Sequence, residues 1–320
     1  MTRLLCALCV LCVSIVSAPS VSSARSGTDI LLLQVLLDRA GFSPGEIDGR
    51  DGSNTRRAAE AYATSRNLGA DDDASIIRKL SDEQRDVQSV VAYTIGAEDA
   101  AGPFTENLPD DLMEQAALPA LGYRTVVEAL AEKFHASPAL LSRLNPGASF
   151  IQDEEIRVPN VAIVSVEPAV PRGTTGVERS SGDADVVVKV WKQQSVLQVI
   201  GADGAILFHA PVTSGSEVDP LPVGEWKVRG VARRPKFNYN PDLFWDSDPS
   251  HAKATINPGP NNPVGTVWID IDKPHYGLHG TPEPSRIGKT ESHGCVRLTN
   301  WDAQRVAALV RPGTRVSFLP

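Results

Sequence analysis

A stretch rich in Pro, Gly, Ser and Thr divides this 320-residue chain into two parts with different sequence patterns. Residues 164–184 lack the regular spacing of apolar residues that a helix or strand requires, so we expect a linker there. Before the linker, apolar residues recur mainly at helical spacing, whereas after it short apolar runs alternate with turn residues. Because a domain takes roughly 100–200 residues, the sequence predicts a multidomain protein.

The first part of the chain, residues 28–80, has the pattern of a small helical domain. Thr28 can cap a helix that ends near Gly41. The apolar residues of this helix follow the i, i+3, i+7 spacing of one helix face: Ile30, Leu33 and Leu37. A second helix is expected over 54–66, after a turn-rich stretch.

Residues 88–163 combine strand and helix patterns and predict a small α+β domain. We expect its strands at 90–95 and 155–159. A Pro-, Gly- and Asp-rich insertion at 96–121 follows the first strand.

Two helix starts are expected between that insertion and the second strand. Thr125 and Glu128 form a capping box, with the threonine at the N-cap and the glutamate three residues later. Ser137 caps the next helix, and Pro138 takes its first helical position. Both patterns place a helix directly after a side chain that can accept a hydrogen bond from the exposed N–H groups.

Residues 185–320 are mainly β in pattern, which favours a sandwich or a partial barrel. One late helix is expected over 300–310. The expected strands lie at 186–190, 195–200, 205–212, 225–231, 267–271 and 315–319.

The first 24 residues resemble a secretory signal. Arg3 supplies a positive start, residues 4–16 form the apolar stretch, and cleavage is expected after Ala24 or, alternatively, after Ala18. The apolar stretch is shorter than the ~20 residues needed to span a bilayer. The sequence therefore predicts an exported protein, in the periplasm or cell envelope, with no membrane span after cleavage.

Cysteine usage singles out one thiol. Cys6, Cys9 and Cys12 all lie in the apolar stretch of the signal, so the mature chain would keep only Cys295. In an oxidising compartment a lone cysteine cannot form an intramolecular disulfide. It is then a buried core residue, an intermolecular link or a reactive group.

The overall charge argues against a nucleic-acid partner. The formal net charge is −8 and the sequence pI is near 5.3. Binding of a phosphate backbone requires clustered Lys and Arg residues, and the sequence has no such cluster.

The residues around Cys295 suggest nucleophilic chemistry. A thiol attacks as the thiolate, and at its usual pKa of about 8.5 only a few per cent is ionised at pH 7. A nearby imidazole, from His279 or His293, can accept the proton and leave an ion pair. Gly294 allows a sharp turn before the nucleophile, so that backbone N–H groups can face a developing oxyanion. Arg297 can hold a substrate carboxylate.

Other interpretations of these residues remain open on spacing alone. Two histidines and a cysteine can bind zinc, but a catalytic zinc site needs three placed ligands and a structural one needs four. The sequence has neither a second mature cysteine nor a helical His-x-x-x-His pair. No metal and no cofactor is therefore expected. A structural core cysteine with structural histidines is also compatible with the spacing.

Four motifs in residues 185–320 resemble the L,D-transpeptidase (YkuD-type) family. The two most specific are YGLHGT at 276–281 and SHGCVRL at 292–298. LPVGEW at 221–226 resembles the turn that enters a strand in that family, and NPGPNNPVG at 257–265 resembles its substrate-side loop. The resemblance implies a β-sandwich catalytic domain.

By motif position, the resemblance implies a role for each site residue. Cys295 is expected as the nucleophile and His279 as the general base, with the Gly280 carbonyl orienting the imidazole. His293 and Gly294 are expected to shape the substrate and oxyanion site. The implied substrate contacts are Ser292, Arg297 and Tyr276.

The resemblance also implies the reaction. The enzyme would attack the L,D peptide bond after the third residue of a peptidoglycan stem tetrapeptide, commonly diaminopimelate, and release D-alanine from a thioester. A second stem peptide would then give a 3→3 cross-link. Water as acceptor would make the protein a carboxypeptidase or cross-link hydrolase, and a protein lysine would make it an anchoring enzyme. A non-catalytic wall-binding protein is the alternative from another class.

Two further segments have expected roles. Residues 28–80 resemble a peptidoglycan-binding helical domain, and 88–163 resemble a divergent LysM domain, with glycan binding or a purely architectural role as alternatives. Residues 233–251 contain four aromatic side chains in a turn-rich stretch. This loop can be a lid over the site or a packed Ω-loop.

Overall fold

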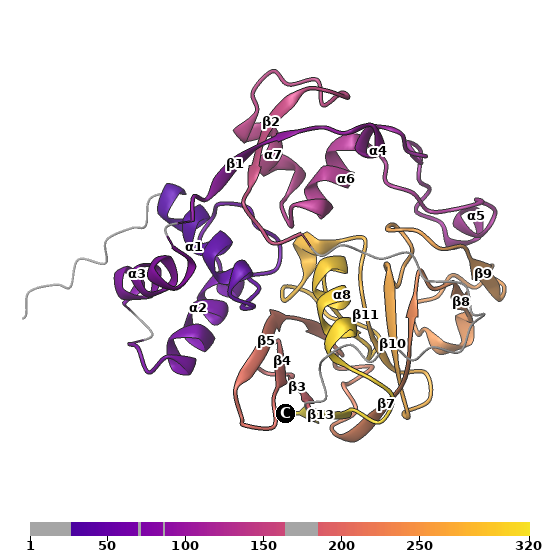
Figure 1. The fold of residues 1–320 in the computed structure, drawn as a ribbon. Helices are drawn as coiled ribbons and strands as arrows, with labels where there is room; N and C mark the ends of the chain where they lie inside the picture. The colour runs from indigo at the N-terminus through magenta and orange to yellow at the C-terminus, as the bar shows by residue number, and fades with distance from the viewer. Residues whose placement is uncertain (1–26, 70–71, 86, 164–184) are drawn as a thin grey trace, which may run out of the picture.

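The computed structural model describes residues 27–69, 72–85, 87–163 and 185–320. It has three folded parts: a helical part, a middle α+β part and a β-rich part (Figure 1). The expected signal at 1–24 and the expected linker at 164–184 lie outside the described residues. Within these residues, none of the helices has the length and apolar character needed to cross a membrane.

The helical part consists of α1 (Gly27–Arg39), α2 (Ser53–Ser65) and α3 (Asp73–Gln84). The first two helices confirm the prediction to within two residues at each end. The third helix was not predicted, although its start has a clear signal, because the Asp72 side chain accepts a hydrogen bond from the N–H of Ser75 at 3.0 Å. The three helices pack around fully buried side chains that include Leu33, Leu36, Leu37, Tyr62, Ile76 and Leu80.

The middle part is a two-stranded antiparallel sheet covered by helices. Both predicted strands are present, and β1 (Val90–Thr94) pairs with β2 (Glu155–Pro159). The helices α6 (Val126–Lys133) and α7 (Pro138–Leu144) lie between them in the chain. Both predicted caps are confirmed, since the side chains of Thr125 and Ser137 accept hydrogen bonds from the N–H groups of Glu128 and Leu140 at 3.1 and 3.0 Å.

The insertion at 96–121 contains two short helices, α4 (Ala97–Ala100) and α5 (Leu112–Ala116). It extends away from the middle part and reaches the β-rich part, where α5 lies beside two short strands, β8 (Phe237–Tyr239) and β9 (Ala254–Ile256) (Figure 1).

The β-rich part contains a nine-stranded mixed sheet in the order β5-β4-β3-β13-β7-β10-β11-β12-β6. All six predicted strands are present, together with short strands that the pattern did not reveal. The strands of this sheet are β3 (Val187–Trp191), β4 (Val196–Ile200), β5 (Ile206–Pro211), β6 (Thr213–Ser214), β7 (Gly224–Arg233), β10 (Val267–Ile271), β11 (Gly277–His279), β12 (Val296–Arg297) and β13 (Arg315–Leu319).

One long strand joins the two halves of this sheet. The beginning of β7, up to Lys227, pairs with β13, and the remainder, from Val228, pairs with β10. The mainly β character that the sequence predicts is confirmed, and the two halves of the sheet are connected along β7. Both halves contribute to the same core, together with the predicted late helix, α8 (Asn300–Leu309).

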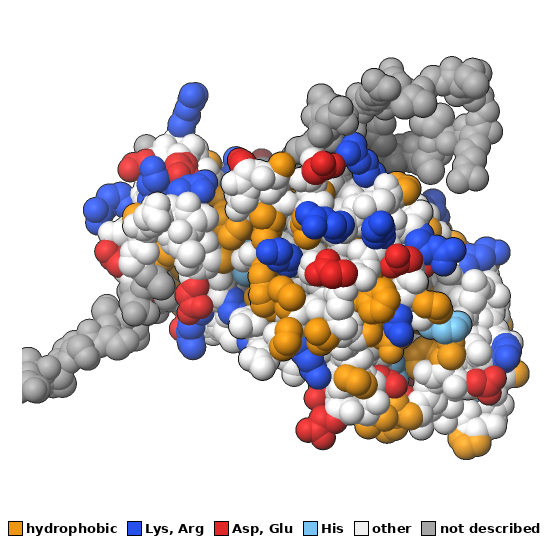
Figure 2. Space-filling view, turned by 90° about the horizontal axis from the view of Figure 1, so that it is seen from below, with side chains coloured by type: hydrophobic (Ala, Val, Ile, Leu, Met, Phe, Trp, Pro, Cys, Tyr) orange, Lys and Arg blue, Asp and Glu red, His pale blue; other side chains and the backbone are white. Residues whose placement is uncertain are grey.

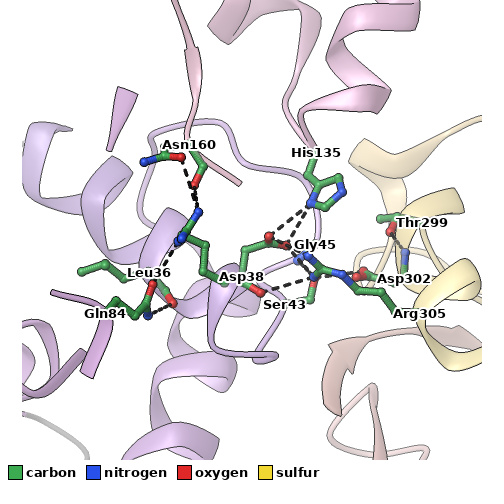
Figure 3. Close-up of polar contacts among 11 residues, drawn as sticks. Leu36, Asp38, Ser43, Gly45, Gln84, His135, Asn160, Thr299, Asp302 and Arg305 are labelled. Carbon is green, nitrogen blue, oxygen red and sulfur yellow. Dashed lines mark hydrogen bonds and ion pairs between the residues drawn. The ribbon is translucent and has the colours of Figure 1, made fainter. Parts of the chain in front are cut away.

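Three polar side chains, Asp38, His135 and Arg305, join the three parts of the protein (Figure 3). Asp38 of α1 is fully buried and forms a bidentate pair with Arg305 of α8 at 2.8 and 2.9 Å. His135, which follows α6, contacts the same carboxylate through Nδ1 at 3.1 Å. Burial alone would raise the pKa of Asp38, but His135 and Arg305 hold it well below its usual range.

The turn after α1 adds backbone contacts to this junction. The N–H of Ser43 donates to the carbonyl of His209 at 2.8 Å, and the N–H of Ile47 donates to the carbonyl of His135 at 2.8 Å. The Ser43 hydroxyl also donates to the Asp302 carboxylate of α8 at 3.0 Å. The turn-rich stretch therefore connects to both other parts of the protein.

Lys and Arg side chains lie interspersed with Asp and Glu on the face that Figure 2 shows, among scattered apolar side chains. This face has no continuous basic surface of the kind that binds a phosphate backbone.

Candidate active site

Parallel pairing of two short strands brings the two sequence motifs together. Leu278 and His279 of β11 lie opposite Val296 and Arg297 of β12. Cys295 directly precedes β12. The pairing therefore places the expected nucleophile, the expected base and the expected carboxylate-binding residue on neighbouring strands of the sheet.

His279 is buried and its proton position is fixed by the backbone. Its Nδ1 lies 2.7 Å from the carbonyl oxygen of Gly280. A carbonyl can only accept, so Nδ1 carries the proton and Nε2 has a free lone pair. Burial, assisted by the positive charge of Arg297, lowers the pKa of His279 to about 3. The imidazole is therefore neutral at pH 7.

Cys295 is half-buried and its thiol is neutral in this arrangement. Its Sγ donates a hydrogen bond to the carbonyl oxygen of His275 at 3.6 Å. Burial raises the pKa of the Cys295 thiol, although the backbone of Gly277 and the charge of Arg297 oppose this effect. Burial disfavours both the thiolate of Cys295 and the imidazolium of His279, and the ion pair that the sequence suggested stays a prediction. The arrangement is a neutral thiol near a neutral base.

The turn before Cys295 requires glycine at position 294. The φ of Gly294 is +93°, and a Cβ there would lie 2.5 Å from the Tyr276 ring. Both the left-handed backbone and the close approach of the ring exclude a larger residue. The ring of Tyr276 thus covers the glycine turn.

Ser292 supports this turn through contacts with the backbone. Its hydroxyl donates to the carbonyl of Cys295 at 2.7 Å and accepts from the N–H of Gly215 at 2.7 Å. The side chain is 4% exposed. The hydroxyl thus supports the backbone of the turn, and the substrate contact expected for Ser292 stays a prediction.

His293 is held by the loop that the sequence suggested as a lid. Its Nε2 lies 2.7 Å from Oδ1 of Asp246. The ring of Phe244 meets the imidazole edge-on at a centroid distance of 5.0 Å. His293 therefore connects the nucleophile turn to residues 233–251.

The guanidinium of Arg297 faces the site without an acidic partner. Among the described residues, no carboxylate lies within ion-pair distance of it. Burial lowers the pKa of Arg297, with Cys295 opposing this effect. A half-buried, unpaired guanidinium is suited to bind a carboxylate of a ligand.

These residues line a cavity of about 980 Å³. One wall contains the predicted residues, which are Tyr276, His279, His293, Cys295 and Arg297. The other wall is formed by residues 235–251, with Leu112 of the insertion. Residues of this loop thus line the site and also pack against other segments, and a lid function stays a prediction.

Several lining residues were not predicted from the sequence. Trp268 stacks on His279 at a centroid distance of 5.4 Å and lies opposite it in the β10–β11 register. Asp246 and Leu112 also contribute to the cavity. Trp268 could have been found from its place in an expected strand, but the other two depend on contacts between distant segments.

The arrangement of His, Cys, Asp and Glu side chains is relevant to the zinc site considered as an alternative. Among the described residues, there is no group of three or more His, Cys, Asp and Glu side chains placed to hold a metal ion. The carbonyl partner of His279 and the thiol contact of Cys295 use the protein backbone.

Comparisons with known proteins agree with the sequence motifs. The family model of the YkuD L,D-transpeptidase catalytic domain matches residues 185–317. YkuD of Bacillus licheniformis, assigned to the L,D-transpeptidases, is 49% identical over 63 residues, which cover 20% of this chain and 38% of that protein. YqjB of Bacillus subtilis, with the same assignment, is 31% identical over 141 residues, which cover 42% of this chain and 70% of that protein.

The match covers only part of some relatives, and the similarity to solved structures is low. The chain spans little more than a third of two YkuD proteins, 38% of one and 36% of the other. An L,D-transpeptidase structure from Mycobacterium smegmatis is 20% identical with a TM-score of 0.36, covering 43% of this chain and 59% of that one. On the family model and the coverage of YqjB, this chain belongs to the L,D-transpeptidase family.

Proposed function

We propose that the protein is an exported L,D-transpeptidase that cleaves peptidoglycan stem tetrapeptides through a thioester on Cys295. The observation that supports this proposal most strongly is the fixed tautomer of His279. Its Nδ1–H is held by the Gly280 carbonyl at 2.7 Å, which leaves Nε2 free to take a proton in the cavity that contains Cys295. A lone thiol with such a base is the arrangement that nucleophilic acyl transfer requires.

The proposed first half-reaction forms the thioester. Rotation about the Cys295 side chain releases the thiol from the His275 carbonyl and turns it toward His279, which is an ordinary rotamer change. The imidazole Nε2 accepts the thiol proton as Sγ attacks the carbonyl carbon of the third stem residue. The C–N bond to D-alanine then breaks, and the leaving amine takes the proton from the imidazole. Hydrogen bonds in such sites commonly become shorter once substrate is bound.

The proposed second half-reaction transfers the acyl group. An acceptor amine from a second stem peptide attacks the thioester carbonyl and passes its proton to His279. The C–S bond breaks, and the thiolate recovers the proton. The product is a 3→3 cross-link and a free Cys295 thiol. The backbone N–H groups of Gly294 and Cys295 are the proposed donors to the oxyanion in both steps.

The charge of Arg297 supports a substrate with a free carboxylate. Its guanidinium lies in the cavity wall next to the strand of His279 and has no acidic partner among the described residues. A stem peptide with a diaminopimelate-type third residue offers such a carboxylate, and bidentate contact would fix its orientation. Tyr276 would contact the same part of the substrate.

The proposal includes the location and the front parts of the chain. The apolar start of the sequence supports export to the periplasm or cell envelope. Residues 28–80 and 88–163 are proposed to keep the catalytic part at the peptidoglycan layer, with glycan as a further ligand. Pull-down of the full chain on purified sacculi, compared with bare polysaccharide beads, tests this part.

Product analysis tests the proposed reaction. The full mature chain and its Cys295→Ala variant are incubated with disaccharide-tetrapeptide, and the products are identified by mass spectrometry. A dimer lighter by one alanine, with the wild type alone, supports the transpeptidase. Tripeptide monomer without dimer points to water as acceptor, and modified protein lysines point to an anchoring enzyme. Unchanged substrate with both chains would favour a non-catalytic wall-binding protein.

A further inference from the structure

The second wall of the cavity is a segment outside the main sheet. We call residues 235–251 the aromatic flap. It contains β8, whose Phe237–Tyr239 backbone pairs with β9 to form a separate two-stranded sheet. A two-stranded sheet is marginally stable in water without further packing. The position of the aromatic flap must therefore depend on what packs against it.

The insertion at 96–121 packs against the outer side of the aromatic flap. A cluster of buried apolar residues joins Leu121 of the insertion to Tyr239 of β8 and Ile256 of β9. Partly buried side chains from both segments surround it, including Leu112, Met113 and Phe244. Leu112 also reaches the cavity, so this contact extends from the outer surface to the substrate space.

Backbone contacts lock the insertion onto the segment after β9. The N–H of Leu121 donates to the carbonyl of Pro258 at 3.2 Å, and the N–H of Asn261 donates to the carbonyl of Leu121 at 3.1 Å. The two chains approach so closely at Gly259 that a Cβ there would lie 1.9 Å from the carbonyl oxygen of Leu121. This approach requires glycine at position 259, and it fixes where the insertion crosses.

A chain of polar contacts connects the insertion to Tyr239, which lines the cavity. Asp111 accepts hydrogen bonds from the first N–H groups of α5 through Oδ1, and its Oδ2 lies 2.8 Å from Nε2 of His251. Nδ1 of His251 lies 3.2 Å from the Tyr239 hydroxyl. Because a carboxylate only accepts, Nε2 of His251 donates to Asp111, and the Tyr239 O–H donates to Nδ1. The orientation of Tyr239 is thereby tied to Asp111.

The inner side of the aromatic flap contacts the nucleophile turn. Asp246 pairs with His293, two residues before Cys295. A shift of the flap would therefore change the cavity at two places, at the wall formed by Tyr239 and at His293.

We propose that Asp111 and the insertion at 96–121 are positioning elements of the active site, which hold the aromatic flap over Cys295 and so determine how tightly the cavity binds a stem peptide. The alternative, a contact that only joins two domains, predicts no specific effect on substrate binding. The claim rests on the proposed function only where a stem peptide is used as the probe.

The substitution Asp111→Asn tests the contact between Asp111 and His251 separately from the helix cap. Asparagine caps a helix as well as aspartate does, so α5 keeps its cap while the carboxylate oxygen that accepts from Nε2 of His251 is lost. Asp110→Asn is the matched control, since it makes the same change of charge at an exposed neighbour. Tyr239→Phe and the Asp111→Asn/Tyr239→Phe double variant test the chain of contacts.

Two readouts on the full chain test the proposal. Hydrogen–deuterium exchange of residues 235–251 should become faster in Asp111→Asn and remain unchanged in Asp110→Asn. KM for disaccharide-tetrapeptide should increase about two- to fivefold in Asp111→Asn, as expected for a partly exposed pair, with kcat unchanged. The double variant should resemble the more affected single variant, because both changes break the same chain of contacts.

The outcomes separate this inference from the proposed function. Equal exchange and equal KM in Asp111→Asn and Asp110→Asn would overturn it, as would a fall in kcat with KM unchanged. If the wild type does not turn over the tetrapeptide, the proposed function fails, and the exchange of the aromatic flap alone decides the positioning claim.

Discussion

The carboxylate of Asp38 in the first helix and the guanidinium of Arg305 in the last helix form a bidentate pair, at 2.8 and 2.9 Å, in the interior of the protein. His135 of the middle part completes this junction. The helix that carries Arg305 also packs on β10 and β11, the strands that carry Trp268 and His279. The helical and middle parts of the protein thus contact α8, the helix that packs on the strands of the active site.

Asp38→Asn should destabilise the protein strongly, because it leaves the buried charge of Arg305 without its partner. Loss of one partner of a buried pair typically costs about 3–5 kcal/mol. Urea unfolding of the full chain measures this loss, and Asp82→Asn, an exposed change in the same helical part, is the control. Since the pKa of Asp38 is depressed on folding, its contribution is present above about pH 4 and disappears as the pH falls further. A free energy of unfolding equal to that of Asp82→Asn would contradict this interpretation.

Glu132→Gln should stabilise the protein at pH 8 but not at pH 5. Burial raises the pKa of Glu132 to about 7, although Asn300 and Tyr123 donate hydrogen bonds to it. The folded state therefore binds a proton that the unfolded state has released, and the wild type loses stability as the pH increases from about 4 to 7. A neutral glutamine avoids this loss, by about 1–3 kcal/mol. Thermal unfolding at both pH values checks it, and an equal effect at both would refute the assignment.

Alkylation of Cys295 by iodoacetamide should require a higher pH than alkylation of an ordinary thiol, because burial raises the pKa of Cys295. Arg297 lowers this pKa, so Arg297→Gln should move the midpoint of the rate–pH profile further up. His279→Gln should leave the midpoint nearly unchanged, since the imidazole is neutral in this pH range. A wild-type midpoint near pH 6 would indicate a resting thiolate–imidazolium pair and contradict the neutral arrangement.

Ser292→Ala distinguishes a supporting role from a substrate contact. Loss of two hydrogen bonds within the nucleophile turn should lower kcat and the Tm, by about 1–3 kcal/mol in stability for groups left unpaired. KM should remain close to the wild-type value. An increased KM with unchanged Tm would restore the substrate contact that the sequence suggested.

Helices and strands could be predicted from the sequence where the residues that determine them lie within a few positions of one another. The caps at Thr125 and Ser137 and the six longer strands of the β-rich part are examples. Strands of two or three residues, such as β11 and β12, have no such signal, because their pairing depends on neighbours in space. The cysteine and histidine of the site could be predicted because the motifs are specific.

The contacts between distant segments could not be predicted. Asp38 with Arg305 and Asp111 with His251 are separated by more than a hundred residues, and each residue alone resembles an ordinary surface charge. The burial of Cys295 and His279, which shifts the pKa values of both groups, could not be predicted either, because burial is a property of the assembled fold. Both failures concern features that only tertiary packing determines.

The formation of a thioester on Cys295 tests the central claim most directly. The full mature chain is mixed with a stem tetrapeptide, quenched in acid within the first turnovers, and measured by intact-protein mass spectrometry with peptide mapping. We expect an added mass equal to the tetrapeptide without its terminal alanine, located on Cys295, and no adduct in Cys295→Ala. Consumption of the tetrapeptide without an adduct on Cys295, or an adduct that persists in Cys295→Ala, would contradict the account.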